Sequence, residues 1–197
     1  YDPGGISHLN VAKTLFNAPM GILGQAAGAA SLPFFSSLFS QQRHGDFASA
    51  VNRAVSRVFA ASLIVAAWMI ALAPPIVDLF RGGSFNRTDA ANTEQYFAIF
   101  AISLALWTAQ GIYARAFYAS RNTLTPALAG SIITLLSIPV YRVFFHTIGM
   151  AGLAVASDTG ILAHTLVLAV LLHRRKLVPI TGLEGGELAR SFLAACV

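Results

Sequence analysis

The side chains best suited to chemistry in this sequence are the ionisable ones that lie within long apolar stretches. Asp158 lies inside one such stretch, between Ser157 and Thr159, while Lys13 and Arg142 lie near the ends of two others. A charged side chain in hydrocarbon costs about 3 kcal/mol or more unless it is paired or faces water. Each of these charges therefore marks either a polar pathway for an ion or anionic ligand, or a structural contact.

Each candidate also has a purely structural interpretation. Lys13 either contacts an anionic substrate or extends its ammonium group to the membrane surface, and Arg142 has the same two options, with the surface position favoured for both. For Asp158 we favour pairing with a basic residue on a neighbouring helix over exposure to a wet cavity. His164 is expected to be a hydrogen-bonded core residue rather than a proton relay, and Gln25 to join an interhelical hydrogen bond.

Patterns typical of enzymes and metal sites are missing from the sequence. It has no His/Cys metal cluster, no Gly-rich phosphate loop that ends in Lys-Ser/Thr, and no Gly-x-Ser-x-Gly elbow. The single cysteine, Cys196, excludes an internal disulfide framework. We therefore expect no catalysis, no metal and no other cofactor.

The composition indicates a membrane protein. Of the 197 residues, 56% are hydrophobic and only 11% are charged, whereas soluble domains carry about 25% charged residues. The net charge of +5 is typical of nucleic-acid binders, but basic residues at the ends of apolar segments are better explained by the positive-inside rule. We expect the lipid bilayer, and no nucleic acid, as a partner.

The positions of the apolar stretches predict an all-α fold, a polytopic transmembrane helix bundle. The polar segment 117–126 separates two apolar runs of about 20 residues, the length that a helix needs to cross the hydrocarbon core. It is therefore expected to be a tight connection, with Tyr118 at the headgroup level and Pro126 in the first turn of the next helix. In all, we predict five complete spans and the start of a sixth, at about 12–39, 58–80, 96–118, 124–145, 150–172 and 187–197.

The distribution of basic residues orients these spans. If odd-numbered spans run from outside to inside, the cytoplasmic connections are 40–57, 115–123 and 173–190. The outer side then has only Arg81 and Arg87 in its connections, with Lys13 and Arg142 near the outer ends of spans. The cytoplasmic connections hold nine basic residues, as the positive-inside rule requires: Arg43, Arg53, Arg57, Arg115, Arg121, Arg174, Arg175, Lys176 and Arg190.

Proline and glycine positions predict local distortions of the first span. Pro19 and Pro33, near its two ends, are expected to bend it. Gly24 and Gly28 form a small-xxx-small pair, for which helix packing is favoured over a direct role in substrate passage.

In the second span, Pro74 and Pro75 are expected to kink the helix or end its regular hydrogen bonding. Trp68 falls in mid-span, where core packing is favoured over anchoring at the interface. The chain starts at Tyr1 and stops within the apolar run 188–197, so we expect a fragment of a longer protein.

Several motifs resemble those of the MurJ (MviN) lipid II flippases, a family within the multidrug/oligosaccharidyl-lipid/polysaccharide exporter superfamily. They occur in the family's order across nearly the whole chain. The family residues with structural roles that they contain are Pro19, Gly24, Pro33, Gly83, Phe85, Tyr118, Pro126 and Gly152. The motifs themselves are Ala12–Gly24, which runs into Gly-x-Leu-Gly, the Leu-Pro of Ser31–Pro33, Leu79–Phe85, Phe117–Pro126, and the Gly-x-x-Gly-Leu-Ala of Gly149–Ala154.

This resemblance implies a fourteen-helix transporter of the bacterial cytoplasmic membrane, with two lobes around a central cavity. Residues 1–197 would form part of the C-terminal lobe, from span eight to the start of span thirteen. The implied partners are an anionic lipid-linked precursor and the N-terminal lobe of the same protein. The implied activity is movement of lipid II to the outer leaflet by alternating access, with cationic side chains holding the pyrophosphate.

The chain departs from the family pattern at the position of a cavity cation. Members of the family have an arginine where this chain has Thr14 and an acidic residue where it has Asn17. Lys13 is adjacent, but a shift of one residue rotates a side chain by about 100° around a helix. Lys13 therefore replaces the arginine only if a bend near Pro19 reorients this face of the helix.

The candidates for the substrate cavity are Lys13, Thr14, Asn17, Gln25, Arg142 and Asp158. Alternative functions are export of another lipid-linked oligosaccharide or of a drug, and a non-transporting membrane scaffold of the same fold. A membrane-embedded transferase would need acidic or histidine residues clustered at one membrane face, and the sequence has no such cluster.

Overall fold

The computed structural model describes residues 4–79 and 87–179, and these residues form six α-helices without a strand. The helices are α1 (Gly5–Ser40), α2 (His44–Ala71), α3 (Ala73–Asp78), α4 (Arg87–Ala119), α5 (Leu124–Ile148) and α6 (Met150–Arg174). All but the short α3 are long and apolar enough to cross a membrane. The prediction of an all-α bundle with five complete spans is confirmed for this part of the chain, whereas the expected sixth span at 187–197 lies outside the described residues.

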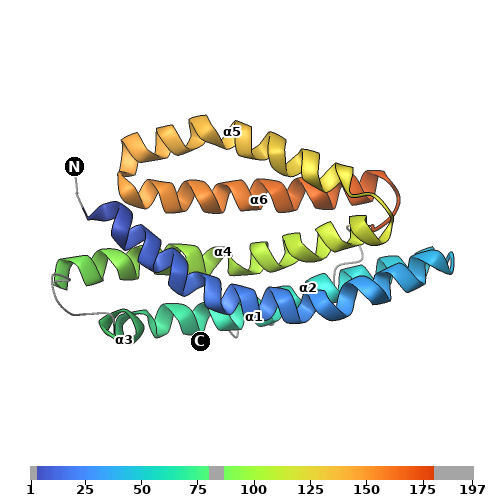
Figure 1. Cartoon of the computed structure of the whole chain (residues 1–197), viewed down its shortest axis with the longest axis horizontal. Helices are drawn as coiled ribbons and strands as arrows, with labels where there is room; N and C mark the ends of the chain where they lie inside the picture. Colours follow the sequence, from blue (N-terminus) through green and yellow to red (C-terminus); the bar gives the residue numbers. More distant parts are fainter. Residues whose placement is uncertain (1–3, 80–86, 180–197) are drawn as a thin grey trace.

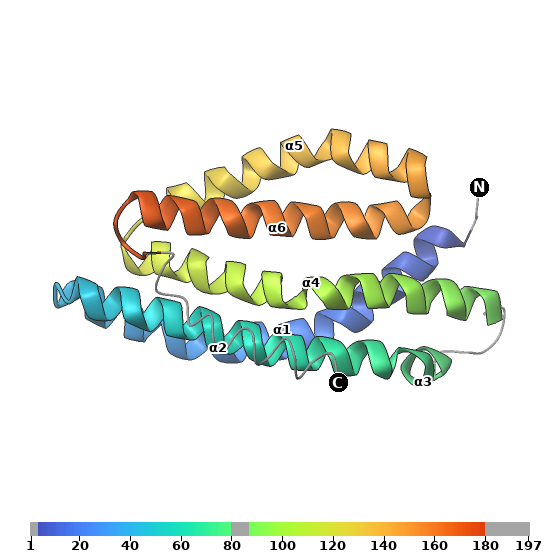
Figure 2. The same ribbon diagram turned by 180° about the vertical axis from the view of Figure 1, so that it is seen from behind.

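Helix α4 is the centre of the bundle. It packs against α1, α2, α3 and α6, while α5 packs mainly on α6 and touches α4 at few positions. Figures 1 and 2 show the five long helices side by side, with α5 outermost beyond α6. The turns 41–43 and 120–123 and the end of α6 lie together at one end of the bundle, which we call the basic end (Figure 1).

The helices are longer than the apolar stretches that predicted them. Helix α1 begins at Gly5 and α2 at His44, well before the apolar runs from 12 and 58, and α4 begins at Arg87, close to the capping residues Thr88 and Asp89 that precede the run from 96. Polar residues continue these helices because their backbone hydrogen bonds do not depend on burial. The apolar pattern therefore located each span but underestimated the length of its helix.

Prolines act differently in the first two spans. Both Pro19 and Pro33 lie inside α1, which continues through them and changes direction between its two halves (Figure 1). In contrast, α2 ends at Ala71 before Pro74 and Pro75, which occupy the first turn of α3. Because a proline needs no N–H donor in a first turn, the chain restarts there as a separate helix, and the predicted break is confirmed.

The connection between α4 and α5 is as tight as its sequence predicts. The Arg121 amide donates to the Tyr118 carbonyl at 2.9 Å, and the Asn122 amide donates to the Phe117 carbonyl at 3.0 Å. The Asn122 side chain then accepts from the Thr125 amide at 3.1 Å, at the start of α5. These bonds satisfy backbone groups that helix ends leave open, so the two antiparallel helices need only a few connecting residues.

The prediction of core packing for Trp68 is wrong, because this side chain is 66% exposed. The face of α2 that is turned into the bundle carries Ser62, Ala66 and Met69, which are all buried. Trp68 lies two residues from Ala66 and therefore points to the opposite side of the helix.

The glycines of Gly149–Ala154 allow the sharp reversal between α5 and α6. Gly149 has a φ of 63°, a backbone conformation that favours glycine. At Gly152, an added Cβ would collide with the backbone carbonyl of Phe144 in α5. The two helices therefore approach closely because residue 152 lacks a side chain.

Candidate functional site

Polar side chains lie exposed on the half of α1 that is farther from the basic end. Lys13, Thr14 and Asn17 are all exposed. A small hollow of about 260 Å³ is lined there by Ser7, Asn10, Val11, Thr14 and Leu15. Polar groups on the open surface of a membrane-spanning helix need water or a polar ligand, which makes this face the first candidate for a transport path.

Within this face, the side chain at the family's cation position, Thr14, and the adjacent side chain, Lys13, differ in the groups available to a ligand. The Thr14 hydroxyl donates to the Asn10 carbonyl of its own helix at 2.8 Å, so its proton is engaged. Lys13 has no ion pair within residues 4–79 and 87–179. Positions 13 and 14 are rotated by about 100° around α1, but this rotation does not bury Lys13, because the side chains of both residues are exposed.

Two other predicted cavity residues lie away from this face. Arg142 is exposed on α5, and α5 has no contact with α1. Asp158 is half-buried on α6 and faces Ser103 of α4. The structure therefore brings Lys13, Thr14 and Asn17 together but places Arg142 and Asp158 on separate helices.

Asp158 also lacks the basic partner that we expected. No basic side chain forms a salt bridge with it in the described part of the chain, and its buried Oδ1 has no hydrogen-bond partner there. The buried Nε2 of His164 is likewise without a described partner, but the His164 side chain forms a hydrogen bond with the backbone of Pro126 in α5, so the expected hydrogen bond is found. For Gln25 the expectation is not tested, because its side chain lies outside the described part of α1.

The structure adds one residue, Arg115, that sequence reasoning assigned to a connection. Arg115 lies within α4, and its Nη2 donates to the Gly24 carbonyl of α1 at 3.2 Å. A methyl group added at Gly28 would overlap the Arg115 guanidinium, and one added at Gly111 would lie 3.1 Å from Nη1. Gly28 therefore serves helix packing by accommodating an arginine from α4, whereas a methyl group added at Gly24 would meet nothing within 4 Å and Gly24 contributes only its carbonyl.

A sequence signal for this contact exists. Gly111 and Arg115 are four residues apart, so they lie on the same face of a helix. A long basic side chain beside a glycine can lie flat along its own helix, and Gly24 and Gly28 provide a second surface without side chains on α1. These spacings can be recognised only once it is known that α1 packs against α4.

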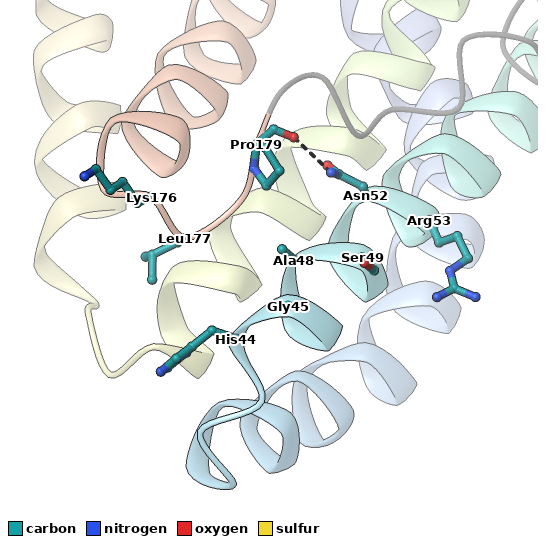
Figure 3. Close-up of a pocket in the computed structure, with 9 residues that line it drawn as sticks. All are labelled: His44, Gly45, Ala48, Ser49, Asn52, Arg53, Lys176, Leu177 and Pro179. Carbon is teal, nitrogen blue, oxygen red and sulfur yellow. Dashed lines mark hydrogen bonds between the residues drawn. The ribbon is translucent and has the colours of Figure 1, made fainter.

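Another hollow, of about 560 Å³, lies at the basic end between α2 and the segment that follows α6. The Asn52 side chain donates to the Pro179 carbonyl at 2.9 Å across it (Figure 3). In Figure 3 the side chains of His44, Arg53 and Lys176 point in different directions and do not converge on one point. This hollow therefore has the geometry of a structural contact rather than of an anion site.

The comparisons with known proteins support the sequence resemblance. A family model described as lipid II flippase MurJ matches residues 1–197. The chain belongs to the lipid II flippase MurJ family. Among similar MurJ proteins, both named probable lipid II flippase, that of Thermotoga maritima is 26% identical over 82% of this chain, and that of Vibrio cholerae is 24% identical over 98%. The matches cover 33% and 37% of those two proteins, so this chain spans about a third of their length.

A solved structure of lipid II flippase MurJ in an inward closed conformation has the same fold. It matches the whole chain with a TM-score of 0.79 and 24% identity, and the match covers 40% of the solved chain. This likeness shows that the bundle has the helical fold of the matching part of that structure.

The residues of the MurJ motifs have identifiable positions in the bundle. Tyr118 is 43% exposed at the basic end, as expected for a side chain at the headgroup level. Pro126 is buried in the first turn of α5, and Gly152 lies against Phe144. Two further motif residues, Gly83 and Phe85, lie outside the described residues.

Proposed function

We propose that the full-length protein containing this chain flips lipid II across the bacterial cytoplasmic membrane by alternating access. Membership of the MurJ family supports this proposal, and the exposed polar face of α1, with Lys13, Thr14 and Asn17, carries it. This face would line the path of the polar head group, because a polar surface on a spanning helix is stable only against water or a polar ligand.

In this proposal Lys13 supplies the local positive charge. The Thr14 hydroxyl already donates to its own helix, and Asn17 carries no charge, so neither balances a pyrophosphate. The Lys13 ammonium is exposed on the same half of α1 and can form charge-assisted hydrogen bonds with phosphate oxygens. The remaining cations would come from the N-terminal lobe. By the positive-inside rule, the basic end of the bundle would face the cytosol.

Complementation tests the proposed function. The full-length gene should restore growth to a bacterium depleted of its own lipid II flippase, with membrane expression confirmed by immunoblot. Failure to restore growth despite normal membrane expression would contradict lipid II flipping. That result would favour transport of another lipid-linked oligosaccharide, for which the neutral Thr14 at the family's cation position is the supporting observation.

The same system tests Lys13 directly. Lys13→Ala should lower the rate of lipid II flipping about tenfold, the effect of losing one charge-assisted hydrogen bond, while Lys13→Arg should retain most of the rate. Arg142→Ala is the matched control, since this exposed cation lies on α5 away from α1. An unchanged rate in Lys13→Ala, or an equal loss in Arg142→Ala, would remove Lys13 from the transport path.

A further inference from the structure

His8 is buried at the start of α1, in a stretch whose other side chains are less covered. Of residues 5–11, only Gly5 and His8 are buried, and Gly5 has no side chain. The His8 Nε2 atom lies 3.3 Å from Oδ1 of Asp89, which belongs to the first turn of α4. The most deeply buried side chain of this helix start is therefore polar, and it contacts a carboxylate of another helix.

Asp89 is held in place for this contact by its own helix. Its carboxylate belongs to the first turn of α4, where the helix dipole favours a negative charge. The fully buried Thr93 hydroxyl donates to the Asp89 carbonyl at 2.8 Å. The side chains of His8 and Asp89 are only 8% and 22% exposed, so the contact lies largely away from water. A hydrogen bond in such surroundings is stronger than at the surface, and it depends on direction.

The buried residues that follow His8 in the first half of α1 are apolar. Ala12 and Phe16 continue the same helix face at intervals of four residues, and the Phe16 ring lies 5.9 Å from the Phe100 ring of α4. Figures 1 and 2 show that this half of α1 crosses α4 at an angle, whereas the second half runs beside α2. Helices that cross touch over a short length only, and apolar contacts have no fixed direction. Ala12 and Phe16 therefore leave the rotation of α1 about its own axis poorly determined.

This rotation decides where the polar face of α1 points. We use the name polar face for the three exposed residues of the proposed transport path, Lys13, Thr14 and Asn17. Since consecutive residues are about 100° apart around a helix, these residues lie about 140°, 240° and 180° around α1 from His8. The polar face is therefore centred opposite the contact with Asp89. A rotation of α1 by the width of one residue would turn this face away from the direction that it has in the structure.

We propose that His8, through its contact with Asp89, is a positioning residue that fixes the rotation of the first half of α1 and thereby directs the polar face. Any rotation that separates the two side chains breaks a bond between largely buried polar groups, which is costly. A buried polar pair can in this way specify one arrangement among several that apolar packing would allow. The consequence for transport rests on the proposed function, whereas the fixed rotation of α1 does not.

The experiment uses the full-length protein in lipid nanodiscs, without substrate, and measures the direction of α1 by spin labelling. Single cysteines carry a nitroxide in turn at the exposed positions 13, 14, 17 and 18, in a background without other cysteines. Collision of each label with a water-soluble nickel chelate and with oxygen gives an accessibility profile around the helix. His8→Ala should shift or flatten this profile.

In the protein without labels, His8→Ala should lower the rate of lipid II flipping about fivefold, the effect of losing one hydrogen bond. His8→Gln keeps an N–H donor for Asp89 and should retain the native profile and rate. The exchanged pair, His8→Asp with Asp89→His, should restore both, because it returns the same two groups to the contact.

The matched control is His146→Ala, an exposed histidine in the last turn of α5, a helix that does not touch α1. It should change neither the profile nor the rate. The proposal would be overturned by an unchanged profile in His8→Ala, or by an equal change in His146→Ala. It would also be overturned if neither His8→Gln nor the exchanged pair kept the native profile while present in the membrane in native amount.

The two readouts separate this inference from the proposed function. A changed profile with an unchanged flipping rate would remove His8 from the positioning of the transport path. A native protein that flips no lipid II would contradict the proposed function, and the profile would still decide whether His8 and Asp89 fix the rotation of α1.

Discussion

Helices α4 and α5 are both apolar enough to cross a membrane, yet they occupy opposite situations in the bundle. In the most apolar stretch of α4, 61% of the residues are buried, against 6% in α5. The buried residues of α4 include many small ones, such as Ala101, Ala105 and Ala109. The exposed residues of α5 are large, among them Leu128, Ile132 and Leu135. The small residues of α4 allow its neighbours to approach closely within lipid, and large side chains such as Phe97 and Leu104 fill the remaining contacts.

The polar side chains of α4 and α5 also differ, in whether they form hydrogen bonds to other helices. On α4, the Thr108 hydroxyl lies 2.9 Å from the Ser62 hydroxyl of α2, and the Leu106 carbonyl accepts from Thr165 of α6 at 3.2 Å. Beyond the first turn of α5, the hydroxyls of Ser137 and Thr147 bond only to carbonyls of their own helix in the described structure. Helix α4 is therefore hydrogen-bonded to neighbouring helices, whereas the hydroxyls of α5 beyond its first turn form bonds only within α5.

The largest expected difference between the two helices concerns matched leucines. Leu104 of α4 is fully buried, and Leu135 of α5 is 67% exposed. Leu104→Ala should lower the free energy of unfolding by about 3 kcal/mol because it leaves a cavity, while Leu135→Ala should change it by less than about 0.5 kcal/mol. Unfolding of the full-length protein in mixed micelles measures both. Equal effects would show that α5 is covered in the whole protein and that its exposure belongs to this chain alone.

Replacing one arginine of α4 and one of α5 should change the free energy of unfolding by amounts that differ less than those for the leucines. Arg115→Gln removes the guanidinium that bonds to Gly24 and should lower the free energy of unfolding by about 1.5 kcal/mol, whereas Arg142→Gln should have an effect below about 0.5 kcal/mol. Gly28→Ala should also destabilise the protein, because its methyl group displaces Arg115. The Gly28→Ala effect should shrink when Arg115 is already replaced, and strict additivity would contradict the packing described here.

The sequence predicted much of this fold because span length and turn chemistry are local properties. The five long helices, the break before Pro74 and the tight turn around Arg121 all follow from the residues present at each place. The central position of α4 and the outward direction of Trp68 depend instead on which helices meet. Apolar content does not encode that choice, since a side chain facing lipid and one facing a neighbour can be equally apolar.

The candidate site was predictable to a similar extent. Lys13, Thr14 and Asn17 share one exposed region because they are close in sequence on one helix. Arg115 was missed because its significance comes from a contact with Gly24, ninety-one positions away along the chain. Asp158 was correctly placed within a span, but its environment at the surface of α4 could not be derived from its neighbours in sequence.

The smallest expected effect tests whether α4 connects its neighbours through hydrogen bonds. A double-mutant cycle of Ser62→Ala and Thr108→Val should give a coupling energy of about 0.6 kcal/mol, the usual value for polar pairs between membrane helices. Ser137→Ala on α5 should cost less than about 0.3 kcal/mol, because its hydroxyl bonds only within its own helix. A coupling energy of zero would mean that each hydroxyl gives its single proton to a carbonyl of its own helix, Val58 for Ser62 and Ala105 for Thr108, and that no hydrogen bond joins the two hydroxyls. The packing of apolar side chains would then be sufficient to explain why α4 lies at the centre of the bundle.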